Sequence, residues 1–139
     1  GQGRAPGVRL TGGLAWRHDG SGVRAGSRRR GHLTMVLISN RGGGIFRTLP
    51  IAHTDPQFLE TYFLTPQQVD FALLAQAYGA SYERPASWEG FIELIRVLPD
   101  RGIRLIEIQT DSAQDHAFRS AYLNGLCTRL TERVFQAPK

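Results

Sequence analysis

The chain has a single cysteine and no long hydrophobic run, and both features limit the kinds of protein to which it can belong. Cys127 is the single cysteine, so no disulfide can form within the chain, and a reducing compartment is expected. No apolar run approaches the roughly 18 residues that a membrane-spanning helix needs, and no secretory signal pattern is present. The opening GQGRAPG has no initiator methionine. We therefore expect an intracellular chain that is a fragment of something longer.

Acidic residues are scarce in the first third of the chain. Residues 1–47 hold nine arginines and one acid, Asp19, a balance of +8, whereas residues 48–139 have a balance of −3. Twelve of the 16 glycines also lie in residues 1–47. We therefore expect residues 1–30 to be a Gly/Arg-rich, partly degenerate start of the domain, and residues 31–139 to form its globular α/β part. The arginines of 24–30 leave polyanion binding open, although no aromatic residue lies among them to stack on bases.

Short apolar runs alternate with amphipathic stretches along the chain. The patterns predict strands at 8–10, 33–38, 81–84 and 103–108, and helices at 56–64, 70–78, 87–98 and from 114 onward. This alternation predicts an α/β fold with a doubly wound parallel sheet and helices on both faces. Ligands of such sheets bind beyond the carboxyl ends of the strands.

Several residues predict where the helices begin, end and pack. Asp70 and Ser87 are of the types that cap helix N-termini, and Gly79 suits a left-handed residue after a helix. From residue 114 onward, apolar side chains recur every four positions, which predicts a long amphipathic helix that docks on a sheet. The members of this stripe are Phe118, Tyr122, Leu126, Leu130 and Val134.

Two of the predicted strands run directly into glycine. In LTMVLISNRGGGIFRTL (33–49) an apolar run ends at Asn40 and three glycines, and the strand at 8–10 runs into Gly12 and Gly13. Residues without a Cβ leave backbone N–H groups where an anionic ligand can approach. The simpler interpretation, a tight turn closed by the asparagine amide, stays open. Gly13 and Asn40 are 27 residues apart.

This spacing resembles that of the thiamine diphosphate enzymes, which carry a Gly-Asp pair after one strand and an asparagine after the next. Within that superfamily the chain is most similar to the 2-succinyl-5-enolpyruvyl-6-hydroxy-3-cyclohexene-1-carboxylate synthases, the MenD-type enzymes of menaquinone and phylloquinone biosynthesis. The resemblance extends over roughly residues 10–110. It is carried by GHLT (31–34), NRGGGIFRTLP (40–50), FLTPQ (63–67), Asp70-Phe71 and Tyr78-Gly79.

The resemblance implies the diphosphate-binding, carboxy-terminal domain of such a synthase, with the thiamine diphosphate-binding fold truncated at its N-terminal part. The full enzyme is a transferase (carboligase) that decarboxylates 2-oxoglutarate and adds the product to isochorismate. In this sequence Mg²⁺ would be bound by the side-chain oxygen of Asn40 and the carbonyl of Gly42. The isochorismate site would be walled by Ile45, Phe46 and Leu49. The cofactor site as a whole would comprise Gly12, Gly13, Leu14, Asn40, Gly42, Gly43, Gly44 and Ile45.

The resemblance also predicts what this chain lacks. The family activates its cofactor with a glutamate of a pyrimidine-binding domain, usually supplied by a second subunit, so no catalytic residue is expected here. We expect a homo-oligomer in the cytoplasm, or in the plastid stroma of a photosynthetic eukaryote, with no membrane or nucleic-acid partner.

Gly13 is the main departure from the family pattern, because it stands where the metal-binding aspartate belongs. Loss of an anionic oxygen ligand opposite a dication predicts weaker binding of Mg²⁺ and diphosphate. The glycines and arginines that follow also predict a frayed helix. We therefore expect no turnover by this chain alone, and a non-catalytic, degenerate remnant of the domain is the alternative.

Overall fold

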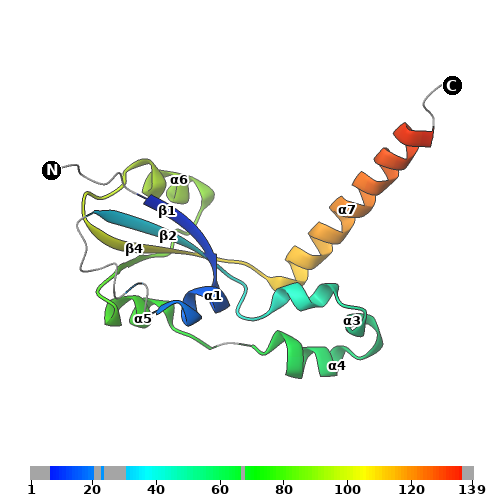
Figure 1. The fold of residues 1–139 in the computed structure, drawn as a ribbon, viewed down its shortest axis with the longest axis horizontal. Helices are drawn as coiled ribbons and strands as arrows, with labels where there is room; N and C mark the ends of the chain where they lie inside the picture. The colour runs from blue at the N-terminus through cyan, green and yellow to red at the C-terminus, as the bar shows by residue number, and fades with distance from the viewer. Residues whose placement is uncertain (1–6, 21–22, 24–30, 67, 136–139) are drawn as a thin grey trace.

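The computed structural model describes residues 7–20, 23, 31–66 and 68–135, and it has a parallel sheet at its centre. The described strands are β1 (Gly7–Gly12), β2 (His32–Ser39), β3 (Ser81–Glu83) and β4 (Gly102–Gln109). They are all parallel, in the order β1-β2-β4-β3 (Figure 1). The predicted parallel sheet is therefore confirmed. The central strand β2 is mostly apolar, as expected for a strand between two layers of helices, whereas β4 also carries the buried charged residues Arg104 and Glu107.

Helices lie on both faces of the sheet. The helices α1 (Gly13–His18) and α5 (Phe71–Ala77) cover one face, and α6 (Trp88–Arg96) covers part of the other. On the first face Trp16 packs edge-on against Phe71, with ring centroids 5.7 Å apart. On the second face Phe91 of α6 packs with Val36 and Ile106. These two clusters hold the sheet between its helices.

The predicted starts of α5 and α6 are confirmed by their caps, and α6 ends two residues before the predicted end at Leu98. The carboxylate of Asp70 accepts a hydrogen bond from the Leu73 N–H at 3.0 Å. The hydroxyl of Ser87 accepts one from the Gly90 N–H at 3.2 Å. Gly79 follows α5 with φ +71°, the left-handed conformation that glycine adopts without strain.

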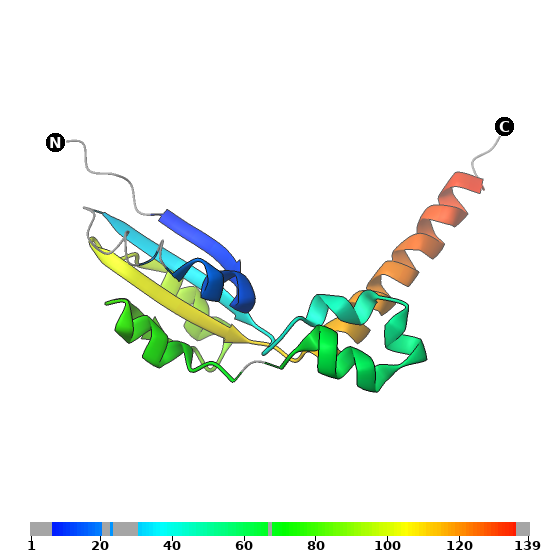
Figure 2. The same ribbon diagram turned by 60° about the horizontal axis from the view of Figure 1, so that its bottom comes forward.

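A second group of short helices lies beyond the carboxyl end of the sheet (Figure 2). It comprises the 3₁₀ helix η1 (Gly44–Thr48), α3 (Ile51–Thr54), α4 (Pro56–Phe58) and the π-helix η2 (Leu59–Leu64). The helix predicted at 56–64 is therefore split between α4 and η2. The chain then returns to the sheet at α5.

The long helix α7 (Ser112–Phe135) is present, but the prediction that it docks on the sheet is wrong for this chain. Phe118 is 76% exposed and Tyr122 57% exposed, and the helix runs away from the sheet (Figures 1 and 2). Its direction is set at its first turn. Asp111 caps that turn, and the Arg47 Nε donates to the Ser112 hydroxyl at 3.1 Å.

The helix predicted to fray after Gly13 is short: α1 has six residues. Even so, β1 pairs with β2, and Trp16 is buried in the core, so this part of 1–30 belongs to the sheet. The arginines of 24–30, Gln67 and the side chain of Val134 lie outside the described residues. None of the described helices is long and apolar enough to cross a membrane.

Candidate functional site

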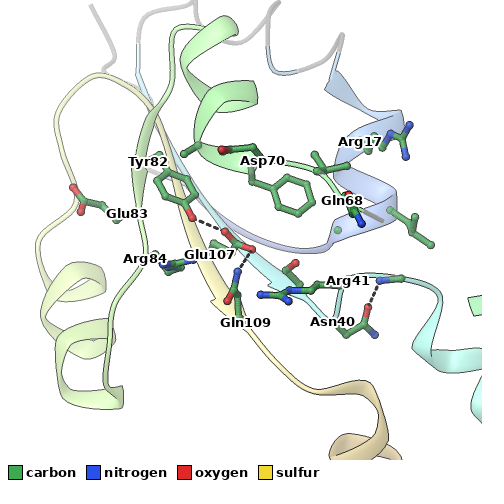
Figure 3. Close-up of a pocket in the computed structure, with 17 residues that line it drawn as sticks. Arg17, Asn40, Arg41, Gln68, Asp70, Tyr82, Glu83, Arg84, Glu107 and Gln109 are labelled. Carbon is green, nitrogen blue, oxygen red and sulfur yellow. Dashed lines mark hydrogen bonds between the residues drawn. The ribbon is translucent and has the colours of Figure 1, made fainter. Parts of the chain in front are cut away.

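A cavity of about 840 Å³ opens at the carboxyl edge of the sheet, on the face covered by α1 and α5. Its walls come from the ends of β2, β3 and β4, from α1 and from the segment that leads into α5 (Figure 3). This is the edge at which parallel sheets bind their ligands. Its polar and charged lining residues are Arg17, Ser39, Asn40, Arg41, Gln68, Asp70, Tyr82, Glu83, Arg84, Glu107 and Gln109.

The two glycine corners predicted from the sequence meet at this cavity. In the register of the sheet Gly12 lies beside Ile38, so the residues that follow β1 and β2 are neighbours. Gly13 and Leu14 line the cavity from one corner, and Asn40 and Gly42 line it from the other. The sheet thus brings together the positions for which the sequence predicted a metal and a diphosphate.

Asn40 closes a tight turn at its corner. Its side-chain Oδ1 accepts the Gly42 N–H at 3.2 Å, and Arg41 between them has φ 59°. Asn40 therefore closes the tight turn that the sequence analysis left open as the simpler interpretation. An amide oxygen has two lone pairs, so this hydrogen bond leaves one of them for a cation.

The surroundings of residues 42–44 are packed too closely to accept a side chain larger than that of glycine. A Cβ at Gly42 would lie 2.5 Å from the Leu64 carbonyl oxygen, and one at Gly44 would lie 2.5 Å from the Asn40 Nδ2. The Gly43 N–H donates to the Leu64 carbonyl at 2.8 Å. The expectation that this N–H is open to a ligand is therefore wrong. The loop is held against the end of η2 by its own backbone.

The remaining predicted residues lie outside the cavity. Ile45 and Phe46 are on η1, at 65% and 38% exposure, and Phe46 packs edge-on against Phe63 with ring centroids 5.8 Å apart. Ile45 and Phe46 could contact a substrate only from the side of the loop that faces away from the cavity. Their assignment to the isochorismate site therefore stays a prediction. The predicted site residues that do not line the cavity are Gly12, Gly43, Gly44, Ile45, Phe46 and Leu49.

A hydrogen-bonded carboxylate lines the cavity and was missed by the sequence reasoning. Glu107 on β4 is only 4% exposed. The Tyr82 hydroxyl donates to its Oε2 at 2.5 Å, and the Gln109 amide donates to its Oε1 at 3.4 Å (Figure 3). A glutamate inside the apolar run LIEI was the available signal, because a charged residue is rarely buried without partners.

Burial raises the pKa of Tyr82 to about 12, and the hydrogen bond to Glu107 and the charge of that carboxylate add to the increase. The folded state therefore holds the tyrosine proton more tightly than the unfolded chain, whose pKa is about 10. We predict that stability falls as the pH rises from about 10 to about 12. Tyr82→Phe should remove that fall, measured as the urea midpoint against pH, and an unchanged profile would contradict it.

The charges at the cavity are mixed. Arg41 extends from the Asn40 loop into it and Arg84 lines it from the end of β3, while Glu107 lies at its base (Figure 3). The guanidinium groups suit an anionic ligand. Among the described residues, no group of three or more histidine, cysteine or acidic side chains could hold a metal ion. A cation at the Asn40 corner would therefore rely on amide and peptide oxygens.

The site has space for the missing carboxylate. A Cβ at Gly13 would make only ordinary contacts, 3.4 Å from the Phe71 ring and 4.0 Å from the Ile38 carbonyl oxygen. The Asn40 amide oxygen and the nearby peptide carbonyls are oxygen donors of the type that Mg²⁺ takes. This donor set falls short by one negative charge.

Comparison with known proteins finds relatives that share between 43% and 50% of their residues with the matched part of this chain. No family model matches the chain. The chain is similar to 2-succinyl-5-enolpyruvyl-6-hydroxy-3-cyclohexene-1-carboxylate synthases of Trichodesmium erythraeum (46% identity over 112 residues, 81% of the chain), Synechococcus sp. (strain JA-3-3Ab) (50% over 110, 79%) and Rippkaea orientalis (43% over 126, 91%). These matches cover 18–21% of the relatives' own length, so the chain spans about a fifth of them.

Two solved structures share the fold. Benzoylformate decarboxylase from Polynucleobacter necessarius aligns over 77% of this chain and 20% of its own, with a TM-score of 0.64 and 19% identity. A thiamine diphosphate-dependent 4-hydroxybenzoylformate decarboxylase from Rhodococcus jostii aligns over 75% of this chain and 19% of its own, with a TM-score of 0.60 and 20% identity. The predicted thiamine diphosphate-binding α/β fold is confirmed.

Proposed function

The chain belongs to the 2-succinyl-5-enolpyruvyl-6-hydroxy-3-cyclohexene-1-carboxylate synthase family, and from that premise we propose that it forms the diphosphate-binding part of such an enzyme. One observation carries the proposal: the corners after β1 and β2 lie side by side at one cavity, with Gly13 and Asn40 both facing it. Two adjacent strand ends of this kind suit a ligand that bridges them.

In this proposal the Asn40 Oδ1 and the Gly42 carbonyl are the protein ligands of Mg²⁺, and the residues at the corner of Gly13 and Leu14 approach the diphosphate. Arg41 contributes positive charge on the same side of the cavity. Thiamine diphosphate, when bound, supplies the electron sink for decarboxylation. This chain binds and orients it, and we assign no described residue to proton transfer.

The activity of a whole synthase would require more than this chain. We propose that the complete enzyme acts on 2-oxoglutarate and isochorismate in menaquinone or phylloquinone biosynthesis. Its activating glutamate would come from a pyrimidine-binding domain, usually of a second subunit. We further propose a reducing compartment such as the cytoplasm, because the exposed Cys127 would remain a thiol there. The isolated chain is expected to show no turnover.

A second candidate, a non-catalytic remnant that binds nothing, is favoured by one residue. Gly13 leaves the corner after β1 without the carboxylate on which the family's magnesium site depends. The two candidates differ in a single measurable property, which is the affinity of the chain for thiamine diphosphate in the presence of Mg²⁺.

We predict that thiamine diphosphate with Mg²⁺ raises the melting temperature of the chain. A ligand present at roughly 100 times its Kd stabilises the folded state by about 2.7 kcal/mol. Asn40→Ala should abolish the increase and Asn40→Asp should keep it, because only the latter retains an oxygen ligand. Differential scanning fluorimetry measures the shift for each variant against its own ligand-free sample.

Asn124→Ala is the matched control for this experiment. It removes the same amide from the exposed surface of α7, away from the cavity, and should keep the full thermal shift. If thiamine diphosphate leaves the melting temperature unchanged at every magnesium concentration, the remnant candidate replaces the proposal.

A further inference from the structure

Arg47 connects three elements around the glycine loop that follows Asn40. It lies on η1, which is in contact with the start of α7 (Figure 2). Its Nε donates to the Ser112 hydroxyl in the first turn of α7 at 3.1 Å, and its Nη2 donates to the Glu60 carboxylate on η2 at 3.3 Å. The Arg47 side chain is 25% exposed. One largely buried side chain therefore joins η1, η2 and α7.

The two contacts of Arg47 differ in their surroundings. The Glu60 side chain is 53% exposed, and ion pairs that face solvent contribute little to stability. The hydrogen bond to Ser112 is partly buried, and hydrogen bonds are electrostatically stronger away from water. We therefore expect the contact with Ser112 to constrain the local structure more than the contact with Glu60.

Ser112 lies next to the side-chain amide of Asn40. A Cβ at Gly44 would lie 2.5 Å from the Asn40 Nδ2 and 2.9 Å from the Ser112 Cβ, so both side chains occupy the same side of Gly44. The connection to the sheet is tight as well, because the Thr110 N–H donates to the Ser39 carbonyl at 2.9 Å. The first turn of α7 thus forms a wall beside the Nδ2 end of the amide.

The orientation of this amide decides what the corner after β2 can bind. The Asn40 Oδ1 accepts the Gly42 N–H at 3.2 Å, while Nδ2 lies on the side of Gly44 and Ser112. A half-turn of the amide would put an N–H donor in place of the oxygen. A cation can be bound by the oxygen but not by the N–H group, so the corner depends on a fixed amide.

We propose that Arg47 is a positioning residue of the magnesium site, an inference that rests on the function proposed above. Its hydrogen bond to Ser112 holds the first turn of α7 against the Asn40 amide, which keeps Oδ1 directed to the Gly42 N–H and to the cation. Arg47 is not among the residues that line the cavity. It acts through Ser112, so removing either partner of that hydrogen bond should have the same effect.

Hydrogen exchange of two backbone amides tests the positioning without any ligand. Arg47→Met and Ser112→Ala should each accelerate exchange of the Gly42 N–H by about two- to tenfold, the factor that corresponds to one hydrogen bond. The Gly43 N–H should keep its rate, because its acceptor lies on η2. An unchanged Gly42 rate would overturn the proposal. Equal acceleration at Gly42 and Gly43 would overturn it too, since the whole loop would then have loosened.

Magnesium titrations test the consequence for binding. At a fixed concentration of thiamine diphosphate, Arg47→Met and Ser112→Ala should each raise the Mg²⁺ concentration that gives half of the thermal shift by about tenfold, an effect typical of residues that support metal ligands. The double variant should match each single variant, because both residues act through one hydrogen bond. Effects of the two substitutions that add would contradict this coupling.

Two control variants remove comparable contacts that do not reach Asn40. Glu60→Gln removes the charge of the exposed partner of Arg47. Arg9→Met removes an arginine of β1 that pairs with Asp19 at 3.1 Å on the surface. Both controls should keep the Gly42 exchange rate and the magnesium midpoint of the unmodified chain.

The outcomes separate this proposal from the proposed function. Ser112→Ala is expected to fold, because the Asp111 carboxylate caps α7 by accepting the N–H groups of Ala113 and Gln114, and alanine favours a helix. If thiamine diphosphate with Mg²⁺ gives the unmodified chain no thermal shift, the proposed function fails. The exchange rates at Gly42 and Gly43 still decide whether Arg47 positions the amide.

Discussion

Gly13→Asp should increase the magnesium-dependent affinity of the chain for thiamine diphosphate by at least about tenfold. The variant restores an anionic oxygen at the corner after β1, beside the corner that carries Asn40. Even residues that only support metal ligands change affinity by about 10- to 100-fold, and a direct carboxylate ligand contributes at least as much. Isothermal titration calorimetry with and without Mg²⁺ measures the change.

The surroundings of Gly13 leave room for the aspartate side chain of this variant. Its Cβ would make ordinary van der Waals contact with Phe71, and a carboxylate in the first turn of α1 interacts favourably with the helix dipole. The variant is therefore expected to fold. Gly13→Asn is the matched control, because it has the same size without the charge and should give a smaller gain. Equal affinities for Gly13→Asp and the unmodified chain would contradict the site assignment.

Gly42→Ala should destabilise the chain by about 1–3 kcal/mol, the usual cost of overpacking. The added Cβ would lie 2.5 Å from the Leu64 carbonyl oxygen, a distance at which backbone must move. That same oxygen accepts the Gly43 N–H. The shift therefore breaks the contact that holds the Asn40 loop against η2, and magnesium-dependent binding should be lost together with the stability. Urea denaturation measures the change in the free energy of unfolding.

Gly12→Ala separates this steric effect from a general effect of replacing glycine. Gly12 has φ −90°, which any residue adopts, and a Cβ there would meet no heavy atom within 4 Å. The variant should stay within about 0.5 kcal/mol of the unmodified chain. If Gly42→Ala and Gly12→Ala were equally stable, the packing role of the loop glycines would be wrong.

Local signals in the sequence were sufficient to predict the sheet and its site edge. The run at 33–38 is apolar on both faces apart from Thr34, and the run at 103–108 is apolar apart from Arg104 and Glu107, a pattern typical of central parallel strands. Asp70 and Ser87 each indicate a helix N-terminus by residue type alone. The adjacency of Gly13 and Asn40 followed from the parallel pairing of their strands.

The features that sequence reasoning missed depend on contacts between distant residues. Tyr82 and Glu107 are 25 positions apart, and only the pairing of β3 with β4 makes them partners. The direction of α7 depends on the hydrogen bond between Arg47 and Ser112, 65 positions apart. An apolar stripe predicts that a helix buries one side, but it does not specify which surface covers that side.

Mapping amide chemical shifts by NMR as thiamine diphosphate and Mg²⁺ are added tests the central claim most directly, because it reports where on the chain the ligand binds. We predict that the largest shifts fall at residues 12–14 and 40–44, that they require Mg²⁺, and that thiamine without its diphosphate does not reproduce them. Shifts confined to other parts of the chain, or none in either the unmodified chain or Gly13→Asp, would contradict the account.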